Sequence, residues 1–181
     1  MLKKVLSISL VFVLTMAACG KTETPATTNT EGKAFKIATV VKDSSDPWFI
    51  RMEEGVKKYA ADTGHEAFQK GPSKTDAAQQ VQVIEELMAQ DIDALCVVPI
   101  SPEACEPVLK KAMDKGIVVI THESTAQQNT DFNIEAFDNV GYGAYMMDEL
   151  AKAMGEEGKY VTMVSFLTNS AHKEWSDAAI A

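Results

Sequence analysis

Short runs of β-branched and apolar residues alternate with segments of helical periodicity along most of this chain, and this alternation limits its fold more than any other feature. The run at 34–41 reads AFKIATVV, and similar runs recur at 94–98 and 117–121. Between them, apolar residues recur every three or four positions, as on one face of a helix. Strands separated by helices predict right-handed βαβ units, and therefore an α/β fold with a doubly wound parallel sheet.

Helix boundaries follow from caps and breakers. Asp46-Pro47 predicts the start of a helix that ends at Gly64, and 75–90 predicts a second helix. A proline inside a helix loses a backbone hydrogen bond and costs about 3 kcal/mol. We therefore expect a turn at 101–106 and a third helix that begins near Pro107 and ends at Gly116.

The remaining elements continue the alternation. We expect further strands at 65–69, 132–137 and 160–167, and a helix capped by Asp138 or Asn139. A last helix beginning at Ala171 reaches the end of the sequence without a cap or a terminal glycine. The segment from 137 onward is too short to enclose a core, so we expect a fragment of a longer, two-lobed protein.

The first eighteen residues are typical of an export signal. Lys3 and Lys4 precede an apolar run at 5–16, and small residues lead to Cys19. The run is shorter than the roughly 20 apolar residues that span a bilayer. The order Met16-Ala17-Ala18-Cys19 is similar to a bacterial lipobox, which implies lipid attachment at Cys19 and anchoring outside the cytoplasmic membrane, periplasmic or at the cell surface. An ordinary secreted chain remains the alternative.

Composition separates a tether from a globular part and excludes some partners. Residues 20–33 hold five threonines and a single apolar residue, so 19–33 is predicted to be a disordered tether. The whole chain is 46% hydrophobic with a formal net charge of −9. Such a charge repels a phosphate backbone, so we do not expect nucleic-acid binding. Three cysteines are too few and too scattered for a disulfide framework, and Cys96 and Cys105 are expected to be inert, the first in a strand and the second in the turn after it.

Polar loops that follow the predicted strands are the candidate site. Ligands bind beyond the carboxyl ends of the strands in open parallel sheets, and three such loops are polar: 42–48, 122–124 and 168–172. An indole can stack on the apolar face of a sugar, while carboxylates accept hydroxyl hydrogens and cationic or imidazole groups donate. The residue types therefore suit a small polyol or sugar, with these candidates: Lys42, Asp46, Trp48, Phe49, Glu123 and His172.

Three of these candidates also have a structural interpretation. Phe49 is in phase with the buried helix face, Asp46 fits a helix cap, and Lys42 fits a solvated surface charge. Trp175 is expected to pack rather than to contact ligand. No metal, cofactor or catalytic role is expected, because HExxH, a phosphate loop, G-x-S-x-G and paired metal-ligating cysteines are all missing from the sequence.

Several motifs together resemble the type I periplasmic sugar-binding proteins of ABC transporters, whose members bind ribose, rhamnose or autoinducer-2. The resemblance covers 34–181 and rests on these segments: Asp46-Pro47-Trp48-Phe49 with Gly55, Val98-Pro99 with Ser101-Pro102, 116–121, and Asp138-Asn139-Val140. It implies ligand contacts at Asp46, Trp48 and Phe49, at Glu123 and Ser124 in the loop at 122–124, and at His172. Lys42 falls on the lysine that the autoinducer-2 binders use.

The resemblance also implies an organisation and a function. The chain divides into a signal peptide (1–18), the tether (19–33), an N-terminal lobe without its return strands (34–136) and the start of a second lobe (137–181). We expect a lipoprotein that captures a small carbohydrate by closure of two lobes and delivers it to an ABC permease and its ATPase. Alternatives are a sugar sensor for a membrane kinase, a non-functional fragment, a repressor core and a secreted hydrolase; the last two lack the expected motifs.

Overall fold

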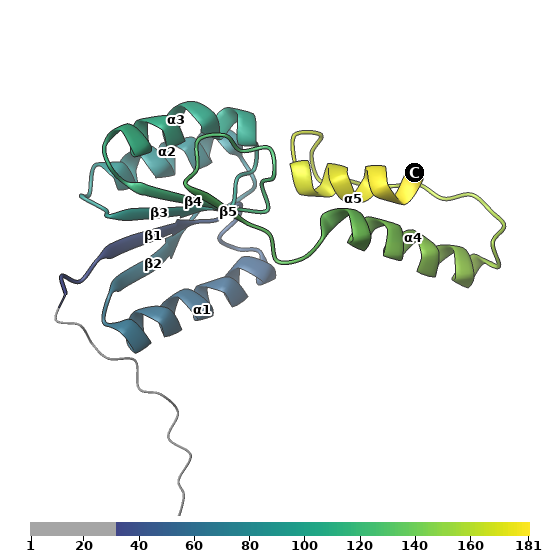
Figure 1. Ribbon diagram of the computed structural model, residues 1–181, viewed down its shortest axis with the longest axis horizontal. Helices are drawn as coiled ribbons and strands as arrows, with labels where there is room; N and C mark the ends of the chain where they lie inside the picture. Colours follow the sequence, from purple (N-terminus) through teal and green to yellow (C-terminus); the bar gives the residue numbers. More distant parts are fainter. Residues whose placement is uncertain (1–31) are drawn as a thin grey trace, which may run out of the picture. The chain divides into compact units, whose positions relative to one another are not determined.

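The computed structural model describes residues 32–181, and a parallel five-stranded sheet with flanking helices forms the part from β1 to β5 (Figure 1). The strands run in the spatial order β2-β1-β3-β4-β5, and every neighbouring pair is parallel. The strands are β1 (Lys36–Val40), β2 (Glu66–Lys70), β3 (Ala94–Val97), β4 (Val118–His122) and β5 (Phe132–Ile134). The helices are α1 (Pro47–Thr63), α2 (Ala77–Met88), α3 (Pro102–Asp114), α4 (Asn139–Met154) and α5 (Ser170–Ile180).

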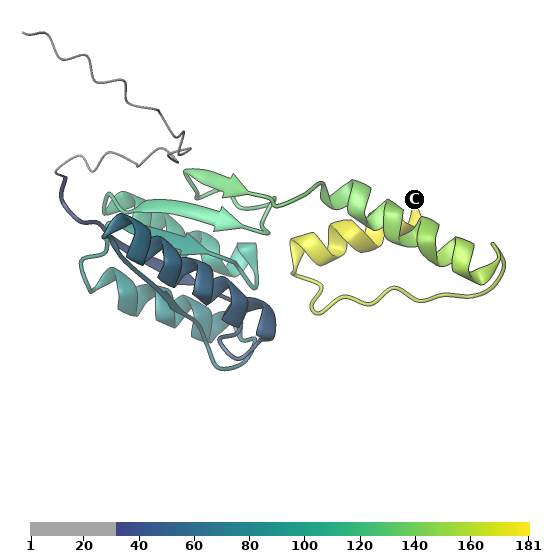
Figure 2. The same ribbon diagram turned by 90° about the horizontal axis from the view of Figure 1, so that it is seen from below.

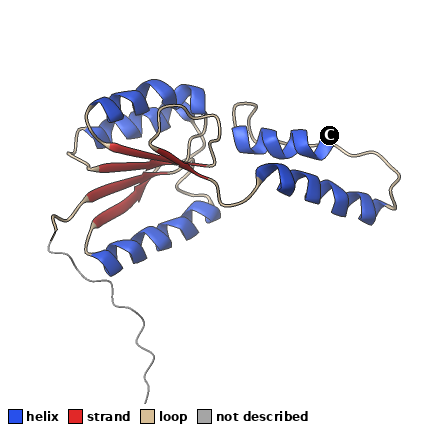
Figure 3. Cartoon of the chain, in the orientation of Figure 1, coloured by secondary structure: helices blue, strands red, loops and turns tan. Residues whose placement is uncertain are grey.

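Helices cover both faces of the sheet, which confirms the predicted α/β class. Figure 3 shows α1 on one face and the pair α2 and α3 on the other, and the view in Figure 2 agrees. The main core lies between the sheet and α2 and α3, and the residues there with no more than 1% exposure include Val40, Ile84, Leu95, Leu109 and Val119. A smaller core on the α1 face contains Val41, Phe49 and Val98. Because successive strand residues point to opposite faces, Val40 and Val41 serve different cores.

The first helix has the boundaries that its sequence predicts. The Asp46 carboxylate accepts a 2.8 Å hydrogen bond from the Trp48 amide, and Pro47 occupies the first helical position. Gly64 ends the helix with φ 75°, a left-handed conformation that glycine adopts without a Cβ penalty.

The expected turn at 101–106 is wrong, because α3 already begins at Pro102. Ser101 caps the helix by accepting a hydrogen bond from the Ala104 amide, and Pro107 lies inside it. The carbonyl that Pro107 leaves unpaired, four residues earlier, belongs to Glu103, an exposed residue that water can reach. Burial of the helix face that contains Val108 and Leu109 offsets this loss.

Cys105 therefore lies on a helix rather than in a turn. Burial raises the pKa of its thiol to about 12, with a further contribution from the Glu106 carboxylate. Burial also raises the pKa of Cys96 on β3. A thiol with a raised pKa forms little of the reactive thiolate, in agreement with the expectation that both cysteines are inert.

The strand expected at 160–167 is also wrong. This segment has no strand assignment, and Val161, Met163 and Leu167 are 90%, 94% and 86% exposed. Among residues 32–181, no strand lies beside it to share backbone hydrogen bonds. The strand expected at 132–137 is present but ends at Ile134.

Two helices, α4 and α5, pack against each other beyond the sheet (Figures 1 and 2). Gly143 permits their close approach, since a Cβ at this position would collide with the Trp175 carbonyl oxygen. Asp138 caps α4 by accepting from the Val140 amide, as predicted. None of the helices within 32–181 has the length and hydropathy needed to cross a membrane. The predicted signal peptide, Cys19 and all of the tether except Gly32 and Lys33 lie outside the described residues.

Candidate ligand-binding site

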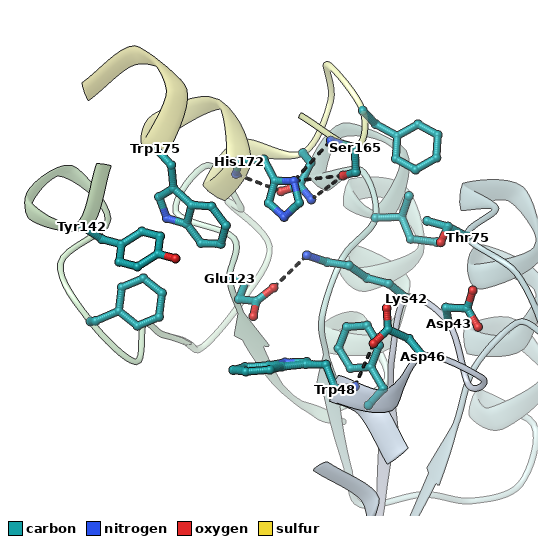
Figure 4. A pocket seen from close by; sticks show the side chains of 15 residues that line it. Lys42, Asp43, Asp46, Trp48, Thr75, Glu123, Tyr142, Ser165, His172 and Trp175 are labelled. Carbon is teal, nitrogen blue, oxygen red and sulfur yellow. Dashed lines mark hydrogen bonds and ion pairs between the residues drawn. The ribbon is translucent and has the colours of Figure 1, made fainter. Parts of the chain in front are cut away.

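A cavity of about 370 Å³ opens where β1 and β4 end and α5 begins (Figure 4). Its size falls within the range of small-molecule sites, and its position is the one that open parallel sheets use for ligands. Of the predicted site residues, the structure brings Lys42, Asp46, Trp48, Phe49, Glu123 and His172 to this cavity.

An ion pair occupies the centre of the pocket. Lys42 follows β1 by two residues, Glu123 directly follows β4, and Lys42 Nζ lies 2.8 Å from Glu123 Oε2. The two side chains are only 10% and 18% exposed. Glu123 has φ 54°, a left-handed conformation that is uncommon outside glycine and costs of order 1 kcal/mol. Such strain often marks a functional position, and here it occurs at the residue whose carboxylate faces the pocket.

The start of α1 supplies an aromatic wall. Trp48 is 59% exposed and lines the cavity, which supports the interpretation that it faces ligand. Phe49 is 5% exposed and packs on Val41 and Val98, and it also lines the cavity. Asp46 likewise borders the cavity while capping α1.

His172 projects from the first turn of α5 toward the ion pair (Figure 4). The Ser165 amide donates to its Nδ1 at 3.3 Å, so the neutral ring carries its hydrogen on Nε2. Burial lowers the pKa of His172, the positive charge of Lys42 lowers it further, and Glu123 opposes this effect. The ring is therefore neutral at pH 7 and can donate one hydrogen bond from Nε2.

Ser124 is not brought to the pocket. It is fully buried, its amide donates to Glu135 Oε1 at 2.9 Å, and it does not line the cavity. The left-handed turn at Glu123 is the reason, because it directs Glu123 toward the cavity and the next residue into the protein.

Other lining residues were not predicted from the sequence. Ser165 and Phe166 fall within the strand that does not form, whereas Asn169 lies in a loop that the strand pattern did identify. Phe137, Tyr142 and Trp175 form an aromatic cluster, with Trp175 stacked on His172 at 4.8 Å between ring centroids. Nothing in their local sequence places Phe137 and Tyr142 near the strand ends. Within 32–181, no three His, Cys, Asp or Glu side chains group closely enough to hold a metal ion.

An open parallel sheet with a pocket at its strand ends is an arrangement typical of α/β proteins that bind small molecules. The chain belongs to the periplasmic binding protein family: residues 37–181 match the periplasmic binding protein domain. Its fold is that of the type I members, as similar solved structures show.

Curated relatives include a D-ribose/D-allose-binding protein of Pseudomonas aeruginosa, 35% identical over 47% of this chain and 28% of the relative. A ribose import binding protein of Bacillus subtilis is 26% identical over 96% of this chain and 58% of the relative. The chain thus covers between 28% and 58% of the length of these two relatives.

Solved structures of solute-binding proteins share this fold. A solute-binding protein from Burkholderia graminis in complex with D-arabinose has a TM-score of 0.74 at 27% identity, covering 82% of this chain and 50% of that one. A solute-binding protein from Clostridium phytofermentans with bound L-rhamnose has a TM-score of 0.77 at 20% identity, covering 82% of this chain and 46% of that one.

Proposed function

We propose that this chain is part of a solute-binding lipoprotein of an ABC importer, which captures a small carbohydrate outside the cytoplasmic membrane and delivers it to the permease. The observation that carries the proposal is the Lys42–Glu123 ion pair at the strand ends, next to the exposed indole of Trp48. The role is binding rather than catalysis, in line with relatives that are named as binding proteins.

The chemistry of the pocket suits a polyhydroxylated ring. Lys42 Nζ and His172 Nε2 donate to sugar oxygens, and the Glu123 carboxylate accepts from hydroxyl groups. The Trp48 indole offers a flat apolar surface for the C–H face of the ring. Neighbouring hydroxyls can bridge the ammonium and the carboxylate, so a vicinal diol satisfies both members of the ion pair at once.

The relatives support a carbohydrate without fixing which one. Relatives are named as ribose- and allose-binding proteins, and a solved structure at 27% identity is a complex with D-arabinose. A pentose, rhamnose or an autoinducer-2-like ligand is consistent with the pocket's volume and donor set.

The proposed organisation has a signal peptide at 1–18, lipid on Cys19, a tether at 19–33, a first lobe at 34–136 and the start of a second at 137–181. The cavity is lined from both sides of residue 137, by Glu123 and by His172. Closure of two lobes around the ligand would bury it between these walls.

A sugar panel tests the proposal. The product of the complete reading frame that contains these residues is titrated with pentoses, rhamnose and autoinducer-2 in a calorimeter. We expect binding of at least one, and Trp48→Ala should weaken it several-fold because the stacking surface is lost. Tyr59→Ala, which removes a 44% exposed ring on the same helix outside the cavity, should leave affinity unchanged.

Absence of binding across the panel would overturn the proposal, and equal affinity in Trp48→Ala would remove this residue from the site. Binding together with a neighbouring receptor-kinase gene instead of permease genes would favour a sensor.

A further inference from the structure

The buried side-chain amide of Asn139 connects the segment before α4 with α5. Asn139 is the first residue of α4 and is 6% exposed. Its Oδ1 accepts a 2.7 Å hydrogen bond from the indole nitrogen of Trp175 on α5. The amide oxygen therefore holds a residue that lines the cavity.

The nitrogen of the same amide donates hydrogen bonds to two carboxylates. Asn139 Nδ2 donates to Glu135 Oε2 at 3.2 Å and to Glu174 Oε2 at 3.0 Å. Glu135 Oε1 in turn accepts from the Ser124 amide, the peptide group that directly follows Glu123. Hydrogen bonds thus run without a break from the Trp175 indole to the backbone next to the strained pocket carboxylate.

A second link runs parallel to the first. The Thr125 hydroxyl donates to the other oxygen of Glu174, so α5 is also tied to the loop after β4. Within the described residues, neither Glu135 nor Glu174 forms an ion pair, and neutral donors hold both carboxylates.

Only an uncharged group that both donates and accepts satisfies this position. A carboxylate at residue 139 would lack the donor and would add a third negative charge beside Glu135 and Glu174. An aliphatic side chain would leave the indole N–H and two carboxylates without their partner.

Trp175 lies at the cavity among other aromatic rings. Its ring borders the cavity, stacks on His172 at 4.8 Å and meets Tyr142 edge-on at 5.1 Å. Figure 4 shows Trp175 and His172 on the side of the Lys42–Glu123 pair opposite to Trp48.

We propose that Asn139 is a positioning residue that fixes the Trp175 indole relative to the loop carrying Glu123, and that Trp175 is a second aromatic contact for the ligand. This inference rests on the proposed function. It predicts that affinity depends on a side chain that touches no ligand atom.

Asn139→Asp and Asn139→Leu test the proposal in the product of the complete reading frame. Protonated aspartic acid offers a carbonyl acceptor and one hydroxyl donor in place of the amide oxygen and N–H donors of asparagine, whereas the ionised form has no donor. The titratable groups facing residue 139 are Glu135 and Glu174, and their charges raise the pKa of the introduced acid. We expect Asn139→Asp to bind sugar about tenfold more weakly at pH 8 and nearly as well as the parent at pH 5. Asn139→Leu should be weak at both pH values.

Fluorescence separates positioning from general destabilisation. In the 181-residue chain, Trp48→Phe leaves Trp175 as the only tryptophan. Adding Asn139→Leu should shift its emission to longer wavelength, because the indole loses its partner and its fixed packing. Lys173→Ala is the control, since Lys173 pairs with Asp177 on its own helix.

Unchanged emission together with affinity within twofold of the parent would overturn the proposal. Affinity loss in Asn139→Asp that does not depend on pH, with unchanged emission, would also overturn it. If the parent binds no sugar, the proposed function fails, while the emission shift still decides the link between Asn139 and Trp175.

Discussion

Two segments of similar composition have opposite outcomes in this molecule. The run at 117–121 becomes β4, with Val119 fully buried, whereas the run at 160–167 remains without regular structure and exposes Val161 and Met163 almost completely. β4 has β3 on one side and β5 on the other. The comparison shows that β-propensity is realised only where neighbouring strands accept and donate the backbone hydrogen bonds.

The regions that contain these two segments differ in burial in the same way. Residues 33–134 enclose two cores, whereas α4 exposes Tyr145, Met146 and Leu150 by 40% or more.

Hydrogen exchange should show the largest difference. Amides of β3 and β4 lie in a buried parallel ladder and open only with the core, while the amides of 161–163 have no backbone partner in the described structure. We expect exchange at least about a thousandfold slower in the strands, measured by mass spectrometry or NMR at constant pH. Comparable protection at 161–163 would show that this segment pairs in solution.

Leu95→Ala should destabilise the chain by about 3 kcal/mol, because it leaves a cavity in the main core. Leu150→Ala is the matched change in the other region and should cost less than about 1 kcal/mol, since Leu150 is 40% exposed. Urea denaturation followed by circular dichroism measures both. Equal effects would mean that α4 is buried in solution.

Lys42→Met should cost about 2 kcal/mol, because the largely buried Glu123 carboxylate loses its partner. Lys173→Met removes an ion pair whose side chains are 61% exposed and should change stability by less than about 0.5 kcal/mol. The double variant Lys42→Met/Glu123→Gln should recover part of the loss in the same urea experiment. No recovery would mean that the lysine stabilises the protein by packing alone.

The pH dependence contributed by His172 should be the smallest effect. Its folded pKa lies below the unfolded value of 6.5, so the unfolded chain binds the proton first as the pH falls. This contribution should favour the folded state fully above pH 6.5 and be lost as the pH falls through the lower folded pKa, and His172→Gln should abolish it. Because Lys42 contributes to the shift, Lys42→Met should raise the pKa of His172, as followed by NMR titration. An unchanged pKa would show that α5 does not approach Lys42 in solution.

Many of the helix and strand positions in residues 33–134 could be predicted from local sequence signals. The cap at Asp46 and the stop at Gly64 set α1 as expected, and the apolar runs at 94–98 and 117–121 became β3 and β4. The error at 101–106 came from giving the proline penalty too much weight, since Ser101 and the buried face of α3 outweigh it.

The candidate site was predictable only in part. Lys42, Trp48, Glu123 and His172 were found because polar loops at strand ends meet at one edge of a parallel sheet. Ser124 was misplaced, because a left-handed φ at Glu123 cannot be read from two adjacent polar residues. The roles of Asn139 and Trp175 depend on contacts 36 positions apart in the chain.

The sequence by itself determined the α/β alternation, the capped helices and the loops that carry polar groups, because these depend on side-chain periodicity and on interactions within a few residues. Only the tertiary structure decided which segments became strands, which polar groups paired, and which aromatic rings came to line the cavity. Strand pairing, burial and the left-handed turn at Glu123 depend on neighbours distant in the chain, and their energies exist only once those neighbours are in place.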